Sequence, residues 1–258
     1  MSGRFHLGWQ IAGALFVFFL LAPLVLVVLF AFTDRALANF PIENLSLRWW
    51  QRMFEHRQFV PALRNSLIVG GTVGLVSAVI GTMAAMGLAR LPPRRAGLGI
   101  AVLSLPLMLP PLVLAVALLT FYVSVGLRLS LLTVILSHLL FTQPFVVLVV
   151  YTRMLGFDER VVESARDLGA SPLRAFVTVT LPIIQPTVIG AALIAVALSI
   201  DDFVITFFTI GSGNTLPTFV WGMIRTALTP TVNAIGTLLI LVTVGSTLAA
   251  LWLTRYRG

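Results

Sequence analysis

The chain has 258 residues, of which 59% are hydrophobic and only 10% are charged. A soluble domain of this length carries about a quarter charged residues, so the composition predicts a membrane protein. All 17 basic residues are arginine; the missing lysine excludes a Walker A phosphate loop, and the missing cysteine excludes disulfides and thiolate chemistry.

The distribution of charge predicts transmembrane helices. Seven runs contain no Asp, Glu, Lys or Arg, namely 5–33, 65–89, 96–127, 129–152, 175–200, 203–224 and 226–254. A hydrocarbon core about 30 Å thick requires about 20 apolar residues per helix. We therefore predict an all-α, polytopic membrane protein whose residues 1–258 form one transmembrane domain. Its six transmembrane helices are expected at about 11–32, 65–89, 97–122, 131–151, 187–209 and 233–253.

The first apolar stretch is predicted to be an uncleaved span, because it is longer than the 7–15 residues of a signal-peptide core. The segment 44–59 then mixes Trp49, Trp50, Phe54 and Phe59 with arginines. This mixture predicts an amphipathic helix at the outer interface. The segment could equally contact another protein on the outer face of the membrane, and the sequence does not separate these alternatives.

The second and third spans differ in their helix-packing signals. In the second, Gly70, Gly74, Ser77, Gly81 and Ala85 recur every three or four residues, which predicts close packing between helices of this chain. In the third, Pro106, Pro110 and Pro111 are expected to interrupt the helix. A broken helix at membrane depth is tolerated where it is buried or lines a cavity, so these prolines either line a pathway or form a packing kink.

The polar residues of the fourth and fifth spans are more simply explained by hydrogen bonding within the helix bundle than by a catalytic or binding function. His138 and Gln143 are weaker candidates for function in the fourth span. A lone membrane histidine such as His138 could shuttle protons or bind substrate, but it more often hydrogen-bonds a neighbouring helix. Ser199 and Thr206 are expected to bond back to carbonyls of their own helix.

Between the fourth and fifth spans, the loop at about 152–186 predicts a helix, a tight corner and a second helix. Asp158 is a suitable N-cap, Gly169 suits the left-handed residue that ends a helix, and Ser171 with Pro172 begins another. The second helix is expected to stop at Leu181-Pro182.

The first of these helices is amphipathic. Its apolar stripe is formed by Val161, Val162, Ala165 and Leu168, and its polar face by Arg160, Glu163, Arg166 and Asp167. A short helix of mixed charge, capped at both ends, favours docking into a protein groove over lying on lipid headgroups.

Asp201 and Asp202 are the only acidic residues in any predicted span. An intramembrane carboxylate costs about 2.5–3.5 kcal/mol on insertion scales, so it faces a cavity or a partner. Successive helical residues point about 100° apart, so one carboxylate is expected on a cation pathway and the other against a neighbouring helix or subunit. Asp201 is the preferred pathway residue; a structural ion pair is the alternative.

The loop also resembles a known family. Seven residues resemble the "EAA–G–I-LP" loop of ABC importer permeases in spacing and type: Glu163, Ser164, Ala165, Gly169, Val179, Leu181 and Pro182. Two of them depart from the pattern, since Ser164 replaces an alanine-type residue and Val179 replaces the usual isoleucine. The stretches "LPPLVLAVALLTFY", "SIDDFVITFFTIGSGNTLP" and "TPTVNAIGTLL" resemble the spermidine/putrescine subgroup, in particular its second permease subunit.

The resemblance implies a translocation subunit of an ATP-driven importer, and it implies that the matching residues and Asp167 couple this chain to an ATPase. The implied partners are a second, homologous permease, two ATPase copies that bind ATP and Mg²⁺, and an extracytoplasmic binding protein. This chain itself is expected to hold no cofactor or metal. Asp201, Asp202, Pro110 and Pro111 become the expected substrate pathway, and the bacterial inner membrane the expected location.

Arginine placement favours cytoplasmic termini, because ten arginines then lie inside and seven outside. The inside set is Arg4, Arg90, Arg94, Arg95, Arg153, Arg160, Arg166, Arg174, Arg255 and Arg257. Arginines at span ends anchor the protein to lipid, so the net charge of +8 does not predict a nucleic-acid partner.

Three other functions are alternatives to polyamine import. The chain could import another small solute within the same family, or it could be a proton-coupled transporter that uses the aspartate pair. A membrane enzyme with Ser212 as nucleophile and His138 as base is disfavoured, because the two residues belong to different predicted regions.

Overall fold

The computed structural model describes residues 2–36, 40–226 and 229–256. Arg257, which the arginine count placed in the cytoplasm, lies outside these residues. Within them the regular structure is helical, apart from an isolated β-bridge between Thr33 and Leu45. Five helices are long and apolar enough to cross a membrane, and a bent pair of helices can form a sixth span. The prediction of an all-α polytopic membrane protein is confirmed.

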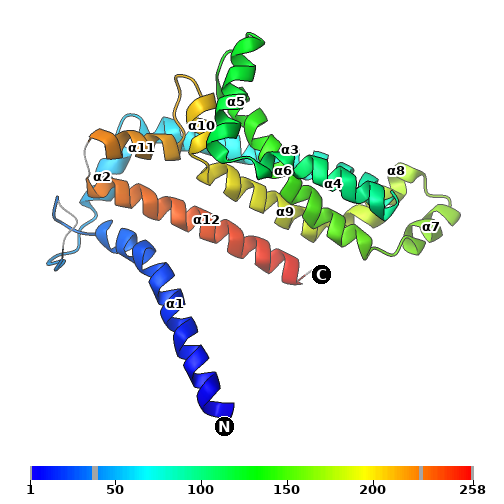
Figure 1. Ribbon diagram of the computed structural model, residues 1–258, viewed down its shortest axis with the longest axis horizontal. Helices are drawn as coiled ribbons and strands as arrows, with labels where there is room; N and C mark the ends of the chain where they lie inside the picture. The colour runs from blue at the N-terminus through cyan, green and yellow to red at the C-terminus, as the bar shows by residue number, and fades with distance from the viewer. Residues whose placement is uncertain (1, 37–39, 227–228, 257–258) are drawn as a thin grey trace. The chain divides into compact units, whose positions relative to one another are not determined.

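The helices follow the predicted order, with α2 inside the segment predicted to be amphipathic, α11 as an addition, and the third and fifth predicted spans each divided in two (Figure 1). Their bounds are α1 Ser2–Phe30, α2 Arg48–Glu55, α3 Phe59–Ala89, α4 Pro93–Met108, α5 Pro111–Ser124, α6 Leu131–Leu155, α7 Arg160–Asp167, α8 Pro172–Ala175, the π-helical turn η1 Phe176–Thr180, α9 Leu181–Asp201, α10 Val204–Thr209, α11 Leu216–Thr226 and α12 Pro230–Tyr256.

The chain forms two compact units. The first contains residues 1–60 and 219–241, and the second contains residues 61–218 and 242–258. The organisation of residues 1–258 as one transmembrane domain stays a prediction.

In the first unit, α2 has the amphipathic character that the sequence predicts. Trp49 and Met53 are buried, whereas Phe54 is exposed. The guanidinium groups of Arg48 and Arg52 lie 5.5 and 4.9 Å from the centre of the Trp49 ring, within the range of cation–π attraction. The arginines therefore cover the outer side of a tryptophan whose inner side is packed.

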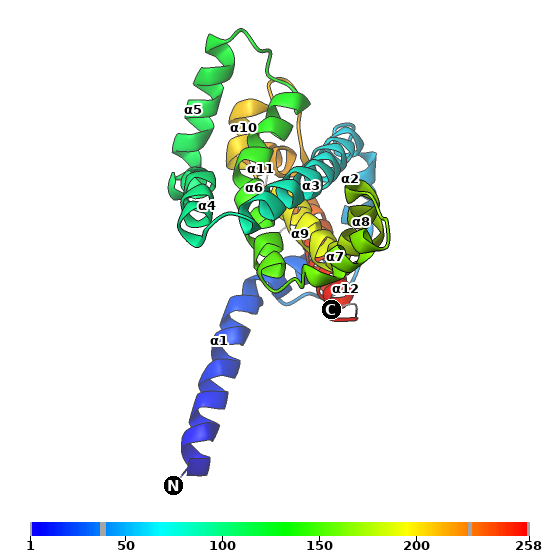
Figure 2. The same ribbon diagram turned by 90° about the vertical axis from the view of Figure 1, so that its right-hand side faces the viewer.

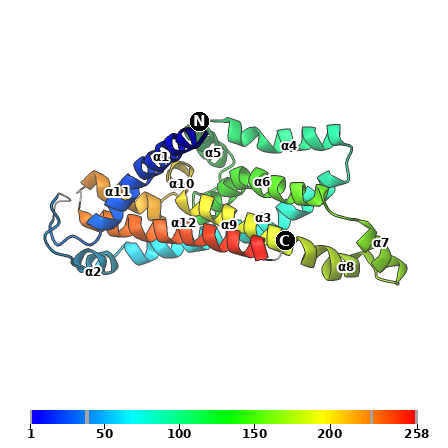
Figure 3. The ribbon, with the colours of Figure 1, turned by 90° about the horizontal axis from the view of Figure 1, so that it is seen from below.

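The second unit is built around α3, α6 and α9, which run alongside one another (Figures 1 and 3). Small and β-branched side chains form the contact, namely Ala85, Val146, Val147, Val150, Ala191 and Ala195. A second cluster joins α3 and α6 to the end of α10 through Val69, Val73, Val134 and Ile210. With such small side chains in contact, dispersion forces hold the helices together where lipid offers no hydrophobic driving force.

Three glycines of α3, namely Gly70, Gly74 and Gly81, lie at these contacts. A Cβ built on Gly70 would lie 2.7 Å from Ile200 Cγ1 of α9, and one on Gly81 would lie 2.6 Å from Val146 Cγ1 of α6. The Ser77 hydroxyl lies 3.2 Å from that of Thr142 on α6. The predicted packing of small residues within the chain is confirmed.

The third predicted span is broken at Pro110 and Pro111, as predicted, whereas the predicted interruption at Pro106 is wrong because Pro106 lies inside α4. Leu109 and Pro110 both precede a proline, which disfavours helical geometry, and both adopt extended backbone angles. The axes of α4 and α5 consequently differ by 94° (Figure 2).

Helix α11 was not predicted. Its start carries a recognisable signal, because the Thr215 N–H donates to Thr218 Oγ1 and a proline occupies an early helical position. At 11 residues it is about 16 Å long and too short to cross a membrane.

We expect Gly81→Ala to destabilise the α3–α6 contact by about 1–3 kcal/mol, because the new methyl group would overlap the stiff side chain of Val146. Gly71→Ala is the matched control, since Gly71 lies on the same helix with no atom within 4 Å of its Cβ position. The measurement is the thermal unfolding midpoint of the detergent-purified protein. Equal midpoints for the two variants would contradict the packing role.

Candidate functional site

The loop between α6 and α9 folds as the sequence predicts in its first half. Asp158 Oδ1 accepts a hydrogen bond of 3.0 Å from the Arg160 N–H at the start of α7. At the other end Gly169 has φ +90°, and its N–H donates to the Arg166 carbonyl at 2.9 Å. The Ala170 N–H donates to the Ala165 carbonyl at 3.0 Å, which completes a Schellman motif.

The corner leads directly into the next helix. Ser171 Oγ accepts from the Arg174 N–H at 3.3 Å, and Pro172 is the first residue of α8. The predicted N-cap and first-turn proline are confirmed.

The predicted stop at Leu181-Pro182 is wrong. The helix passes through both residues and runs from Pro172 to Asp201, because the turn before Pro182 widens into the π-helical η1. The Leu181 N–H bonds the Phe176 carbonyl, five residues back. A widened turn relieves the clash that a proline ring makes with a carbonyl four residues earlier, and such π turns are tolerated inside helices.

The outward surface of α7 and α8 combines charge with exposed apolar side chains. Glu163, Ser164 and Asp167 are exposed, and Leu168 is 90% and Leu173 73% exposed. Ala165 is half-buried, as are Val179 and Leu181 further along, while Pro182 is exposed. Figure 3 shows α7 and α8 at one end of α6 and α9, away from α10.

Glu163 lies between two hollows of this end. It lines a cavity of about 250 Å³ together with Arg90 and Arg166. It also lines an open groove of about 510 Å³ with Gly169 and Ser171. This surface offers a carboxylate flanked by guanidinium groups and by large exposed leucines, which is suited to docking a folded partner.

At the other end of α9 the two aspartates are separated by a break in the helix. Asp201 is the last residue of α9, Asp202 has extended angles of φ −69° and ψ 124°, and α10 begins at Val204. The prediction that the pair occupies successive positions of one continuous helix is therefore wrong. Asp201 is exposed, whereas the Asp202 side chain retains 13% exposure.

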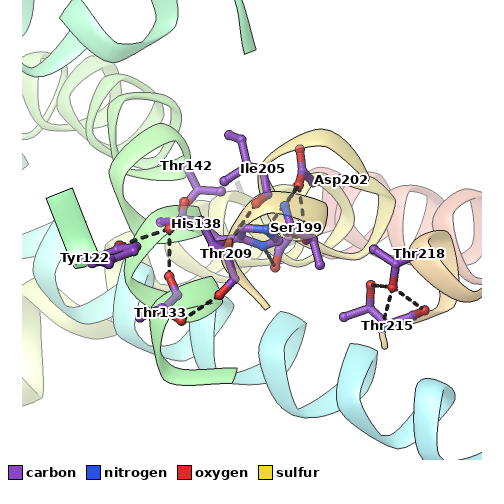
Figure 4. Close-up of polar contacts among 12 residues, drawn as sticks. Tyr122, Thr133, His138, Thr142, Ser199, Asp202, Ile205, Thr209, Thr215 and Thr218 are labelled. Atoms are coloured by element: carbon purple, nitrogen blue, oxygen red, sulfur yellow. Dashed lines mark hydrogen bonds and ion pairs between the residues drawn. The ribbon is translucent and has the colours of Figure 1, made fainter. Parts of the chain in front are cut away.

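Asp202 is held by hydrogen bonds across the break. Its Oδ2 accepts from the Thr206 N–H at 2.9 Å and from Thr206 Oγ1 at 3.1 Å, and it lies 3.3 Å from His138 Nε2 (Figure 4). The carboxylate thus satisfies a backbone donor that the interrupted helix leaves without a carbonyl.

His138 is fully buried on α6 and contacts both sides of the break. Its Nδ1 lies 2.7 Å from Ser199 Oγ on α9, and its Nε2 lies 2.9 Å from Thr206 Oγ1 on α10. The prediction that His138 bonds a neighbouring helix is confirmed. The prediction that Ser199 and Thr206 bond back to their own helix carbonyls is wrong, because their hydroxyls face the imidazole instead.

Pro110 and Pro111 are exposed at the start of α5. From there α5 packs on α10 through Leu114, Ala115 and Ile205. The broken third span and the broken fifth span are therefore neighbours. Among the described residues, no group of three or more His, Asp or Glu side chains is arranged to hold a metal ion.

Residues 77–257 match the family described as "Binding-protein-dependent transport system inner membrane component". The chain belongs to this family. It is 32% identical over 241 residues to the putrescine transport system permease protein PotI of Escherichia coli strain K12, with 90% of this chain and 85% of PotI covered. It is 29% identical to the spermidine/putrescine transport system permease protein PotC of Haemophilus influenzae, with 83% of each chain covered.

The fold is also that of solved transporters. A chain of a bacterial ABC transporter involved in the import of alginate aligns with a TM-score of 0.72 at 17% identity, covering 98% of this chain and 96% of that one. The chain is thus a multi-pass permease of a binding-protein-dependent ABC importer. It is a translocation subunit and not an enzyme, and the ATPase of such importers is a separate subunit.

We expect Gly169→Ala to loosen the corner between α7 and α8. No atom lies within 4 Å of the Cβ position, so the cost of about 1–2 kcal/mol comes from the left-handed backbone alone. Hydrogen exchange should show faster exchange at the Ala170 N–H. Gly156→Ala is the control, because Gly156 has φ −97°. Unchanged exchange at Ala170 in Gly169→Ala would contradict the role of this glycine.

Proposed function

We propose that this permease imports polyamines, and that Asp201 offers the carboxylate that attracts them. The observation that carries the proposal is an exposed carboxylate at a break in a membrane-spanning helix. In surroundings with little water, one carboxylate attracts an ammonium group much more strongly than it does in bulk water. The names of PotI and PotC, which include putrescine and spermidine, support the same class of substrate.

The exposed end of α7 and α8 is the proposed docking site for the ATPase. Docking there would bury Leu168 and Leu173, at about 25 cal/mol per Å² of apolar area removed from water. Glu163 and Asp167 would provide the charged contacts. The residues Glu163, Ser164, Ala165, Asp167, Gly169, Val179, Leu181 and Pro182 form this coupling loop in the proposal.

A single helical segment joins the two proposed sites. Pro172–Asp201 is continuous through the π turn and contains 30 residues, so it is about 45 Å long. It begins at the coupling corner and ends at Asp201. Movement of the corner on ATP binding would therefore reach the carboxylate along one packed element, and alternating access would follow from tilting this segment.

The remaining assembly completes the proposal. A second, homologous permease would enclose the pathway, two ATPase copies would bind ATP and Mg²⁺, and a soluble binding protein would deliver substrate from outside. Both termini would lie in the cytoplasm, which places α7 and α8 on the ATPase side of the inner membrane. Pro110 and Pro111 would line the pathway beside the α9–α10 break.

We expect Glu163→Arg to abolish copurification of the ATPase subunit and to reduce uptake at least about tenfold, which corresponds to 1.4 kcal/mol. The reversed charge would lie against Arg90 and Arg166, which line the same cavity. Glu55→Arg is the control, since it makes the same charge change on the exposed surface of α2. Normal copurification with Glu163→Arg would contradict docking at α7.

We expect Asp201→Asn to reduce uptake of labelled putrescine and spermidine about tenfold while ATPase copurification is retained, since only the pathway charge is lost. Wild-type uptake that survives loss of the ATPase but fails without a proton gradient would instead favour proton coupling. A wild-type transporter that imports no polyamine would overturn the substrate assignment and leave import of another small solute.

A further inference from the structure

Asp201 and Asp202 are adjacent in sequence but differ in their surroundings. Asp201 is exposed at the end of α9. Asp202 Oδ2 contacts His138 Nε2, Thr206 Oγ1 and the Thr206 N–H. The two carboxylates therefore cannot serve a passing cation equally.

The contacts of Asp202 are those of a structural acceptor. Its Oδ2 caps α10 by accepting the Thr206 N–H at 2.9 Å. An unsatisfied backbone group in a membrane costs several kcal/mol. Because this role requires an oxygen acceptor and does not require a charge, an amide can replace the carboxylate.

The His138 ring contacts both sides of the break. One ring nitrogen contacts Ser199 on α9 and the other contacts Thr206 on α10. The Phe141 ring packs against the imidazole in an edge-to-face arrangement, with the ring centroids 5.3 Å apart. With no exposed surface and neighbours on each side, the imidazole has one available position.

We propose that His138 is a positioning residue for Asp201. Through Nε2, which contacts Asp202 and Thr206, it fixes the chain at the break, ends α9 at residue 201 and directs the Asp201 side chain away from the buried cluster. The two carboxylates therefore have different roles. Asp202 stabilises the break by accepting hydrogen bonds, and Asp201 provides the exposed negative charge. The role of Asp201 toward a cation rests on the proposed function, whereas the positioning by His138 does not.

Replacing each aspartate with asparagine removes its charge but keeps a side chain of the same size with an oxygen acceptor. Asp202→Asn keeps an acceptor for the Thr206 N–H, so we expect at least half of wild-type uptake, whereas Asp202→Ala should lose about tenfold, equivalent to 1.4 kcal/mol. Asp201→Asn should lose as much as Asp202→Ala. Equal loss in Asp201→Asn and Asp202→Asn would overturn the division of roles.

Two substitutions at His138 test which ring nitrogen matters. Gln places its amide nitrogen near the position of Nε2 and can reach Asp202 and Thr206, whereas Asn reaches only toward Ser199. We expect His138→Gln to retain uptake and His138→Asn to lose about tenfold. Ser137→Ala is the control, because it removes another buried hydroxyl of α6, bonded to Tyr122 and to the Thr133 carbonyl.

A double-mutant cycle tests whether His138 acts through Asp201. If it does, Asp201→Asn with His138→Asn should be no worse than Asp201→Asn alone, since coupled residues show non-additive effects. A loss of about a hundredfold in the double variant, the product of two independent tenfold losses, would overturn the proposal. Each comparison uses the assembled transporter at equal membrane amounts.

A labelling experiment tests the positioning without any transport. The chain contains no cysteine, so Asp201→Cys introduces a unique thiol in this subunit. In membranes that hold the assembled transporter, with the partner subunits free of reactive cysteine, we expect a cationic methanethiosulfonate reagent to label it readily. The labelling rate should change at least about threefold when His138→Asn is added and stay unchanged with His138→Gln or Ser137→Ala.

The two experiments fail independently. If wild type imports no polyamine but the labelling rate depends on His138, the substrate assignment falls and the positioning role stands. If labelling at position 201 is the same with His138 and with Asn, the positioning role is overturned whatever the substrate.

Discussion

A chain that crosses lipid must satisfy its backbone hydrogen-bonding groups from within, and this requirement governs where the protein interrupts its helices. At the α4–α5 bend the breaking residues are prolines, which lack an N–H, and the Leu114 N–H bonds the Pro110 carbonyl. At the π turn the Leu181 N–H reaches back to Phe176. At the α9–α10 break the Asp202 carboxylate takes the place of a missing carbonyl. Each interruption is therefore compensated by a specific local partner.

Close helix packing makes these interruptions rigid. Glycine and alanine on α3 allow Val146, Val196 and Ile200 to approach its backbone, and His138 of α6 is completely enclosed. A polar cluster inside such packing is held in one arrangement, because every polar group that leaves its partner loses a hydrogen bond that nothing nearby replaces. The exposed corner at Gly169 lies at the opposite end of the same helices, where charged and apolar side chains face outward.

The continuous helical segment from Pro172 to Asp201 connects the corner at Gly169 to the break that follows Asp201. Its π turn accommodates Pro182 without ending the helix, so the corner and the carboxylate belong to one element. In the proposed coupling to an ATPase, this connection would carry a movement of the corner to the carboxylate. The exposed carboxylate of the fifth span, Asp201, is the last residue of α9. Because the helix ends there, its side chain can face away from the bundle.

The sequence by itself determined the features that depend on near neighbours. Charge-free runs predicted the spans, Asp158, Gly169 and Ser171 predicted the capped corner, and the small residues of α3 predicted a close contact, because caps and 3.6-residue periodicity are local. The sequence did not reveal the passage of the helix through Pro182, the helix α11 or the break after Asp201. Only the tertiary structure brought His138 against Ser199 and Asp202, more than 60 positions away, and so made two identical neighbouring side chains different. The two aspartates differ because only Asp202 contacts His138, and such contacts between distant residues cannot be inferred from the order of adjacent residues.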